Sequence, residues 1–302
     1  MAIFKTYDGS QLDDQIELVK DVIKEWDWVI WYPNKESLSK SYSQKGFTAN
    51  TRHYAYENNK LVGFLSSTIG KEIDEVLWGS IHIPFIRIGF EHIEKELMDI
   101  AINVLASQGV KVIRTIAMPG WGDTIQILER HGFGERILLS YVTLFSVSKL
   151  LTSGYIDTKS SIFNESDENY NDYLIETISK INSQSRDELR ERLDNYYANK
   201  TLIARAITQI EQNIAYGLVF KGDNYLEIPG RAFLEVHHLA NDGNKDLIKD
   251  VIIDTFMYLT NKAKEVGYET LWHEVRDVNL LKHYEQLELK FEPCYRYILR
   301  VE

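Results

Sequence analysis

Titratable side chains gather on two expected strands in the second half of the sequence, over residues 232–239 and 268–275. Carboxylates and imidazoles are the side chains that most often take a proton from a reacting group. Since side chains alternate along a strand, Glu235 and His237 should lie on one face and His238 on the other. The candidates for a general base are Glu235, His237, His238, His273 and Glu274.

The composition limits the class of protein. The 302 residues carry 34 basic and 45 acidic side chains, a net charge of −11, and one cysteine, Cys294. The acidic excess argues against nucleic acid and anionic membranes as partners. A single cysteine without any zinc-like Cys/His spacing indicates a reducing compartment and no metal. Because the start has no leader pattern and no apolar run reaches about 18 residues, we expect a cytoplasmic protein.

The first half alternates strand and helix patterns. Apolar residues at steps of three and four predict an amphipathic helix over 11–32, capped by Ser10 and ended by Pro33. Asn58 and Asn59 tolerate left-handed turn geometry and predict a hairpin. The other patterns predict strands at 2–6, 53–57, 61–67, 76–88, 110–117 and 137–147 and helices at 93–107 and 124–130.

The second half repeats this order. Gly63 and Gly109 are 46 residues apart, and Gly217 and Gly267 are 50 apart; each pair marks a hairpin's second strand and the end of a long helix. The length favours two domains, and the pattern predicts two copies of a mixed sheet flanked by helices, an α/β or α+β fold. The expected elements are helices at 171–181, 186–198, 245–265 and 278–287 and strands at 201–210, 213–220, 232–239, 268–275 and 295–301.

Short motifs recur in this order. They are Leu-Glu-Val-His (234–237), Gly-Tyr-Glu-Thr-Leu (267–271) and Asp-Val-Asn-Leu-Leu-Lys-His-Tyr-Glu-Gln-Leu (277–287), with Ile-His-Ile-Pro (81–84), Gly-Val-Lys-Val-Ile-Arg (109–114) and Ile-Leu-Glu-Arg-His-Gly-Phe (127–133) in the first half. Together they resemble the GCN5-related N-acetyltransferase (GNAT) superfamily in tandem, over nearly the whole chain. The resemblance implies two GNAT-like domains, 1-150 and 151-302, each a mixed, mostly antiparallel twisted sheet flanked by helices.

The resemblance also implies acetyl-coenzyme A (acetyl-CoA) as co-substrate. In that family the strand before the long helix diverges from its neighbour along the acetyl-pantetheine arm, and the following loop binds the pyrophosphate. Here Gly243 gives access to the backbone and Lys245 a positive charge at a helix start, although Asp242 and Asp246 oppose an anion. The alternative is a turn that only caps the helix. The implied coenzyme-binding residues are Val236, His238, Leu239, Gly243, Asn244 and Lys245.

A tyrosine in the next helix protonates the departing thiolate in this family. Counting the family pattern from Asp277 places Tyr284 at that position, whereas counting from Asn279 would bury Lys282 and Gln286. Hydrophobic periodicity favours the first register. A core tyrosine is the alternative.

The resemblance places a general base on the diverging strands. Glu235 is the first choice and His237 the second, while His273 and Glu274 flank the other side. For each of them, a solvated or hydrogen-bonded strand residue is the alternative.

The first half departs from the family pattern. Its loop keeps Arg87 but places Phe90, Glu91 and Glu94 where phosphates would lie, and Leu128 stands at the tyrosine position. We therefore expect a degenerate copy that is structural or binds the acceptor. Four aromatic residues near its first helix fit packing between the halves better than an acceptor site; they are Trp26, Trp28, Trp31 and Tyr32.

The expected function is transfer of an acetyl group to the amine of a small molecule or peptide by direct attack, catalysed by the second half. An inactive pair that binds a ligand or a partner protein is the alternative, and another acyl or aminoacyl transferase on the same fold shares every feature used above. The sequence leaves open whether the protein is a monomer or an oligomer.

Overall fold

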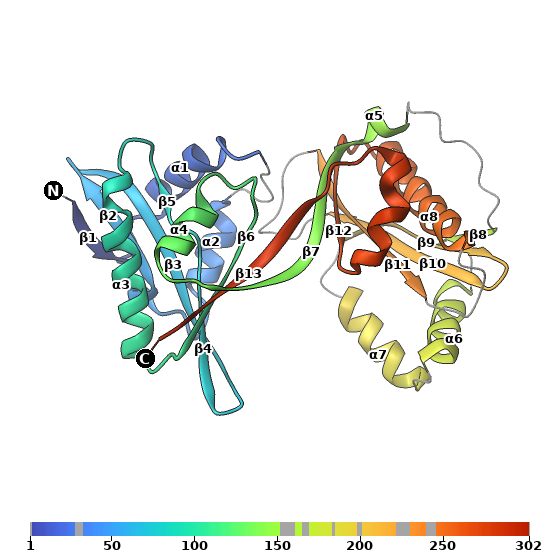
Figure 1. Ribbon diagram of the computed structural model, residues 1–302, viewed down its shortest axis with the longest axis horizontal. Coiled ribbons are helices and arrows are strands. Elements are labelled where there is room, and N and C mark those ends of the chain that lie inside the picture. Colours follow the sequence, from blue (N-terminus) through green and yellow to red (C-terminus); the bar gives the residue numbers. More distant parts are fainter. Residues whose placement is uncertain are drawn as a thin grey trace. The chain divides into compact units, whose positions relative to one another are not determined.

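The chain divides into two compact units. The computed structural model describes residues 2–27, 33–151, 161–164, 169–182, 185–197, 201–221, 230–239 and 246–301. Unit 1 consists of Met1–Leu139 with Glu292–Glu302, and unit 2 of Ser140–Phe291. Figure 1 labels their elements, and each unit is described by itself.

Unit 1 has a mixed sheet in the order β1-β2-β3-β4-β6-β13, in which β4 and β6 are parallel and the other neighbours antiparallel. A short strand, β5, pairs with β3. Its strands are β1 (Ile3–Thr6), β2 (Arg52–Glu57), β3 (Lys60–Ile73), β4 (Val76–Ile81), β5 (Phe85–Ile86), β6 (Val112–Ala117) and β13 (Glu292–Arg300). Its helices are α1 (Leu12–Ile23), α2 (Lys35–Tyr42), η1 (Ala49–Thr51), η2 (Glu91–Ile93), α3 (Glu94–Ser107) and α4 (Thr124–Arg130).

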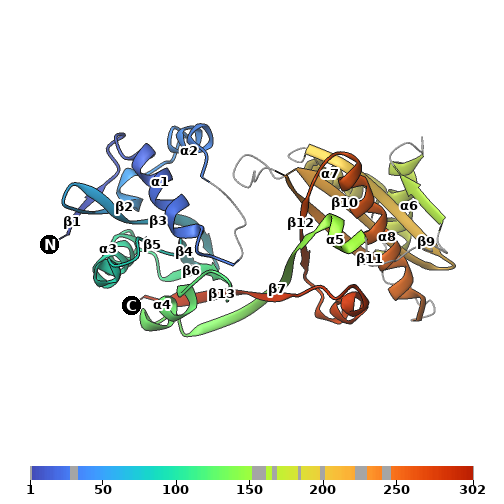
Figure 2. The same cartoon turned by 90° about the horizontal axis from the view of Figure 1, so that it is seen from above.

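Helices cover both faces of this sheet (Figure 2). Helix α1 packs through Leu18 and Val19 on the face of β3 that carries Phe64. Helix α3 lies on the opposite face, where Gly63 approaches Ile93 and Leu97. The alternation of neighbouring residues along β3 therefore separates two layers of helix.

Unit 2 repeats this arrangement in the order β7-β12-β11-β10-β9-β8, with β11 and β12 parallel and the other neighbours antiparallel. Its strands are β7 (Glu135–Ser146, from Ser140 on), β8 (Ser161–Asn164), β9 (Thr201–Ile210), β10 (Asn213–Lys221), β11 (Arg231–Leu239) and β12 (Thr270–Val275). Its helices are α5 (Val147–Leu151), α6 (Tyr170–Asn182), α7 (Arg186–Tyr197), α8 (Asp246–Glu265) and η3 (Val278–Leu287).

Each sheet is completed by a strand from the other half of the sequence. Strand β7 ends the first half but pairs with β12 of unit 2, from Ser146 opposite Thr270 to Tyr141 opposite Val275. Strand β13 ends the chain but pairs with β6 of unit 1. The predicted fold, two mixed and mostly antiparallel sheets with helices, is confirmed. The predicted domain limits, 1-150 and 151-302, stay a prediction about the repeat, because the compact units exchange these last strands.

Several elements differ from the expected ones in unit 1. Helix α1 ends at Ile23, well before Pro33, because Glu25 and Trp26 already form the tighter hydrogen bonds of a turn. The predicted N-cap is also wrong. The Ser10 hydroxyl donates to the Asp8 carboxylate, and no side chain caps the start of α1. The expected strand 76–88 is split into β4 and β5, and α2 was not expected. In unit 2, α5 and β8 were not expected either.

Two pairs of glycines have equivalent roles in the two units. Gly109 and Gly267 both end a long helix in the left-handed conformation, with φ of 84° and 93°. Gly63 and Gly217 occupy equivalent strands, and each allows the long helix to approach the sheet closely. In both units, one glycine ends the long helix and another allows that helix to pack closely on the sheet.

Replacing Gly217 is expected to destabilise unit 2 more than the matching change destabilises unit 1. A Cβ atom at Gly217 would lie 2.6 Å from the backbone oxygen of Glu235, whereas at Gly63 it would lie 2.5 Å from the terminal methyl of Ile93, which can rotate away. We expect Gly217→Ala to lower the free energy of unfolding by about 1–3 kcal/mol and Gly63→Ala by less. Urea unfolding of both full-length variants measures this, and an equal or reversed order contradicts it.

Candidate active site of unit 2

The parallel strands β11 and β12 separate partway along their length. They pair from Arg231 opposite Thr270 to Leu234 opposite His273, and the pairing stops there although both strands continue. On its other edge β11 remains paired with β10 as far as Leu239. Over residues 235–239, the edge of β11 that faces away from β10 therefore has backbone groups that β12 does not pair. Such an edge can hydrogen-bond to an extended ligand.

His273 lies at the point where the strands separate. Its Nδ1 atom is 2.9 Å from the backbone oxygen of Leu234, across the two strands. Burial lowers the pKa of His273 to about 4, so the ring is neutral at pH 7. Since a carbonyl oxygen only accepts, Nδ1 carries the proton and Nε2 presents a lone pair.

Tyr284 lies in η3 beside this histidine. The centre of its ring is 5.0 Å from that of His273, 5.3 Å from Phe256 and 5.6 Å from Phe291. The Tyr284 hydroxyl is buried and has no hydrogen-bond partner among the described residues. Burial raises its pKa above the ordinary value, so the hydroxyl keeps its proton and is a donor at neutral pH.

Helix η3 buries the apolar face that hydrophobic periodicity predicts, beginning at Asp277. The Asp277 side chain accepts from the backbone N–H of Asn279 at 2.9 Å and caps the helix. Lys282 and Gln286, which the other register would bury, are exposed. Glu288 ends the helix in the left-handed conformation that glycine usually takes there, with φ of 52°. The residues of η3 that contact the core are Leu280, Leu281, Tyr284 and Leu287.

The side chains of β11 divide between two faces as the alternation predicts. Val236 packs in the core beneath α8, and His238 lies on the same face. The Nε2 atom of His238 is buried with no partner among the described residues, and burial lowers the pKa of His238. Leu239 packs on the opposite face in the core beneath α6, so only its backbone is available at the edge of β11.

Glu235 and His237 lie together on the α6 face. Nε2 of His237 is 3.6 Å from Oε2 of Glu235, and the ring of His237 stacks on Tyr216 with the centroids 4.8 Å apart. The Glu274 carboxylate, on β12, is 3.3 Å from the Arg276 guanidinium. The structure thus brings the first two candidate bases together on one face, while Tyr284 packs under the other face. Gly243, Asn244 and Lys245, the residues expected to bind phosphate, lie outside the described residues; helix α8 is described from Asp246.

The equivalent parallel strands of unit 1, β4 and β6, also stop pairing partway along their length. Strands β4 and β6 pair only from Trp78 opposite Val112 to Ser80 opposite Arg114. Leu128, which stands at the tyrosine position of the family pattern, is buried.

Stacked aromatic rings lie at the end of α1 in this unit. The ring of Trp26 stacks on Phe85 and on Trp121, with centroids 5.8 Å and 5.4 Å apart. Trp26 therefore packs on aromatic rings of unit 1, and packing between the halves stays a prediction. Its three expected companions, Trp28, Trp31 and Tyr32, lie outside the described residues.

Polar groups of the loop before α3 in unit 1 are paired with carboxylates of the same unit. Arg87, the one basic residue kept from the family pattern, is held by the carboxylates of Asp21 and Glu17. The Glu91 carboxylate accepts from the backbone N–H of Gly89 at 2.8 Å, and this hydrogen bond lowers the pKa of Glu91. A carboxylate thus occupies the backbone donor that a phosphate would need.

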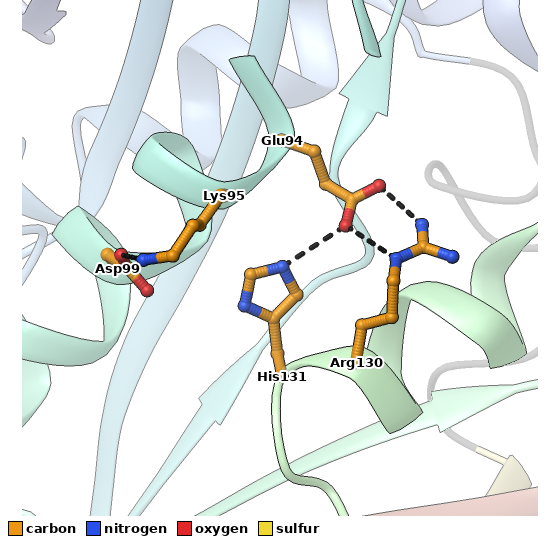
Figure 3. Close-up of polar contacts among 5 residues, drawn as sticks. All are labelled: Glu94, Lys95, Asp99, Arg130 and His131. Atoms are coloured by element: carbon orange, nitrogen blue, oxygen red, sulfur yellow. Dashed lines mark hydrogen bonds and ion pairs between the residues drawn. The ribbon is translucent and has the colours of Figure 1, made fainter. Parts of the chain in front are cut away.

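A second carboxylate ties the start of α3 to the end of α4 (Figure 3). The Glu94 carboxylate is 2.6 Å from Nη2 of Arg130 and 3.2 Å from Nε2 of His131. Lys95 pairs with Asp99 one turn further along α3. Glu91 and Glu94 are therefore engaged in structural contacts, and Arg130 of α4 is already paired.

Solved structures share this fold over almost the whole chain. A tandem GNAT protein from the clavulanic acid biosynthesis pathway has a TM-score of 0.63 at 9% identity, covering 99% of this chain and 98% of that one. A GCN5-related N-acetyltransferase from Sphaerobacter thermophilus has 0.58 at 6%, covering 99% and 95%. A GNAT-family acetyltransferase from Colwellia psychrerythraea has 0.54 at 14%, covering 99% and 100%. No protein-family model and no curated protein matches the sequence. The chain has the fold of a tandem GNAT protein.

The described residues contain no group of three or more His, Cys, Asp or Glu side chains that could hold a metal ion. No helix among them is long and apolar enough to cross a membrane.

Sequence reasoning missed several residues around Tyr284. Phe256 and Phe291 were not predicted to lie against Tyr284, because an apolar helical pattern indicates burial without indicating which rings meet. Thr143 was missed for a different reason: it lies on β7, which the sequence assigns to the other half.

Proposed function

We propose that unit 2 transfers an acetyl group from acetyl-CoA to the amine of a small molecule or peptide. The observation that carries this proposal is the separation of β11 from β12 directly beside Tyr284, a buried hydroxyl that keeps its proton. An extended pantetheine arm suits the open edge at 235–239, and the thioester would then lie within reach of the hydroxyl. The fold shared with the tandem GNAT protein supports the same assignment.

The proposed reaction is a direct displacement. The acceptor nitrogen attacks the thioester carbonyl carbon, forming the C–N bond, and the C–S bond breaks. Glu235, with His237 beside it, takes the proton that the nitrogen loses. Tyr284 gives its proton to the departing sulfur, and a backbone N–H near His237 or His238 stabilises the negative charge on the carbonyl oxygen.

The coenzyme would be held mainly by backbone. Val236, His238 and Leu239 would contribute main-chain groups along the arm, and Gly243, Asn244 and Lys245 would hold the pyrophosphate at the start of α8. Unit 1 is proposed to bind no coenzyme, because its own carboxylates hold Arg87, Arg130 and the N–H of Gly89.

An inactive protein that binds a ligand or partner is the second candidate. The complete burial of Tyr284 and the filled loop of unit 1 favour it. Calorimetric titration with coenzyme A separates the two: we expect one site per chain, and acetyl transfer to at least one acceptor in an amine panel with acetyl-CoA. No heat at millimolar coenzyme A contradicts the proposal and supports the binding protein.

A further inference from the structure

Three arginines lie on one face of the unit 1 sheet and form what we call the arginine strip. They are Arg114 on β6 and Arg296 and Arg300 on β13. Ile298 is directly opposite Arg114 in the β6–β13 ladder. The two β13 arginines are therefore the diagonal neighbours of Arg114, each about 7–8 Å away. Because side chains alternate along a strand, the strip shares its face with Ile116, which is opposite Arg296.

The strip lies on the same side of the sheet as α1. Thr68 of β3 is opposite Ser80 of β4, and Ser80 pairs in turn with Arg114 of β6. Thr68 shares a face of β3 with Phe64, where α1 packs on residues of β2, β3 and β5. Among the described residues, neither β6 nor β13 contributes to that apolar cluster. Ile116, a large apolar residue, is accordingly 45% exposed.

The positive charge of the strip is mostly unpaired. Among the described residues, Arg114 and Arg296 form no ion pair and no side-chain hydrogen bond. Arg300 is 3.0 Å from Glu135, and both of these side chains are largely accessible, so their pair is weak. Like charges on neighbouring strands repel one another. The strip therefore concentrates positive charge in a chain whose net charge is −11.

We propose that the arginine strip binds an extended acidic segment of a partner protein. Guanidinium groups bind carboxylates through paired, charge-assisted hydrogen bonds. Side chains two residues apart in an extended peptide point to the same side, about 6.6–6.8 Å apart. This spacing is close to that of the diagonal arginines, so acidic residues at alternate positions of the segment can each reach one guanidinium. An apolar residue of the same segment can cover Ile116.

A short peptide suits the strip better than a nucleic acid does. Both carry closely spaced negative charges, but a nucleic acid continues over a surface whose net charge repels it. The small size of the strip and the exposed Ile116 at its centre fit a few side chains of a peptide. This binding is separate from the proposed acetyl transfer and does not depend on it.

A fluorescent hexaglutamate peptide, titrated with the full-length chain and followed by anisotropy, tests the proposal. We expect saturable binding that a hexaglutamine peptide lacks. Binding should weaken as the ionic strength rises from about 0.01 M to about 0.15 M, because the screening length falls from about 30 Å to about 8 Å. Arg114→Gln and Arg296→Gln are each expected to raise the Kd about two- to fivefold, the range for an exposed ion pair, and the double variant about tenfold.

Arg192→Gln is the matched control for these variants. Arg192 is an exposed arginine of α7 in unit 2 that has no ion pair or hydrogen bond among the described residues, and Glu188 lies one turn before it. Its replacement should leave the Kd within about twofold of the wild-type value. No binding of hexaglutamate at millimolar chain, or equal binding by the wild-type chain and the double variant, overturns the proposal. Tighter binding of a hexathymidylate oligonucleotide than of hexaglutamate overturns it in favour of nucleic acid.

Discussion

Tyr284→Phe is expected to lower kcat for acetyl transfer about 100-fold, the lower end of the range for a lost general acid. The substitution removes only the hydroxyl group. Burial keeps this group protonated, so the variant loses a donor that is present throughout the neutral pH range. The dissociation constant for coenzyme A should stay within about twofold, because the open backbone edge of β11 is unchanged. Steady-state kinetics and calorimetry measure the two quantities.

The fold of this variant is expected to persist. The Tyr284 hydroxyl has no partner among the described residues, so replacing it by hydrogen breaks no described hydrogen bond. Tyr297→Phe is the matched control, since Tyr297 is an equally buried tyrosine in unit 1. Unchanged kcat in Tyr284→Phe would remove this residue from the reaction and return it to the core.

Glu235→Gln is expected to lower kcat/KM by about 100-fold at neutral pH, because an amide cannot take the proton of the attacking amine. Glutamine keeps the size and the hydrogen-bonding oxygen, so the backbone pairing of β11 with β10 should survive. Activity should recover as the pH rises toward the pKa of the acceptor amine, because the free amine then needs no base. A pH–rate profile of both proteins measures this.

The comparison with Glu274→Gln locates the base. Glu274 lies on β12 and pairs with Arg276, whereas Glu235 lies against His237 on β11. We expect less than about a fivefold loss for Glu274→Gln. A larger loss there than in Glu235→Gln would move the base to the other side of the separated strands.

The order of elements was predictable because it rests on local rules. Hydrophobic periodicity places α3, α8 and η3, and the Asn58-Asn59 pair, with φ of 49° and 62°, forms the expected hairpin turn. The apolar face of η3 also selects the register that buries Tyr284. The length of α1 was wrong because Trp26 continues the apolar pattern, yet its ring is needed on Trp121 after the helix has ended.

The exchange of β7 and β13 was not predictable from the sequence. Each strand has the alternation of a half-buried strand, and that pattern is the same whichever parallel pair it joins. The same limit applies to the site. Alternation separated Glu235 and His237 from His238, but the meeting of His273 with Thr143 depends on a pairing between distant parts of the chain.

A crystal structure of the chain soaked with acetyl-CoA tests the central claim most directly. We expect electron density for the pantetheine arm along residues 235–239 of β11 in unit 2, with the sulfur within hydrogen-bonding distance of the Tyr284 hydroxyl, and none at the loop before α3 in unit 1. Density in unit 1 beside Glu91 and Glu94, with the edge of β11 empty, would contradict the assignment of unit 2 as the catalyst.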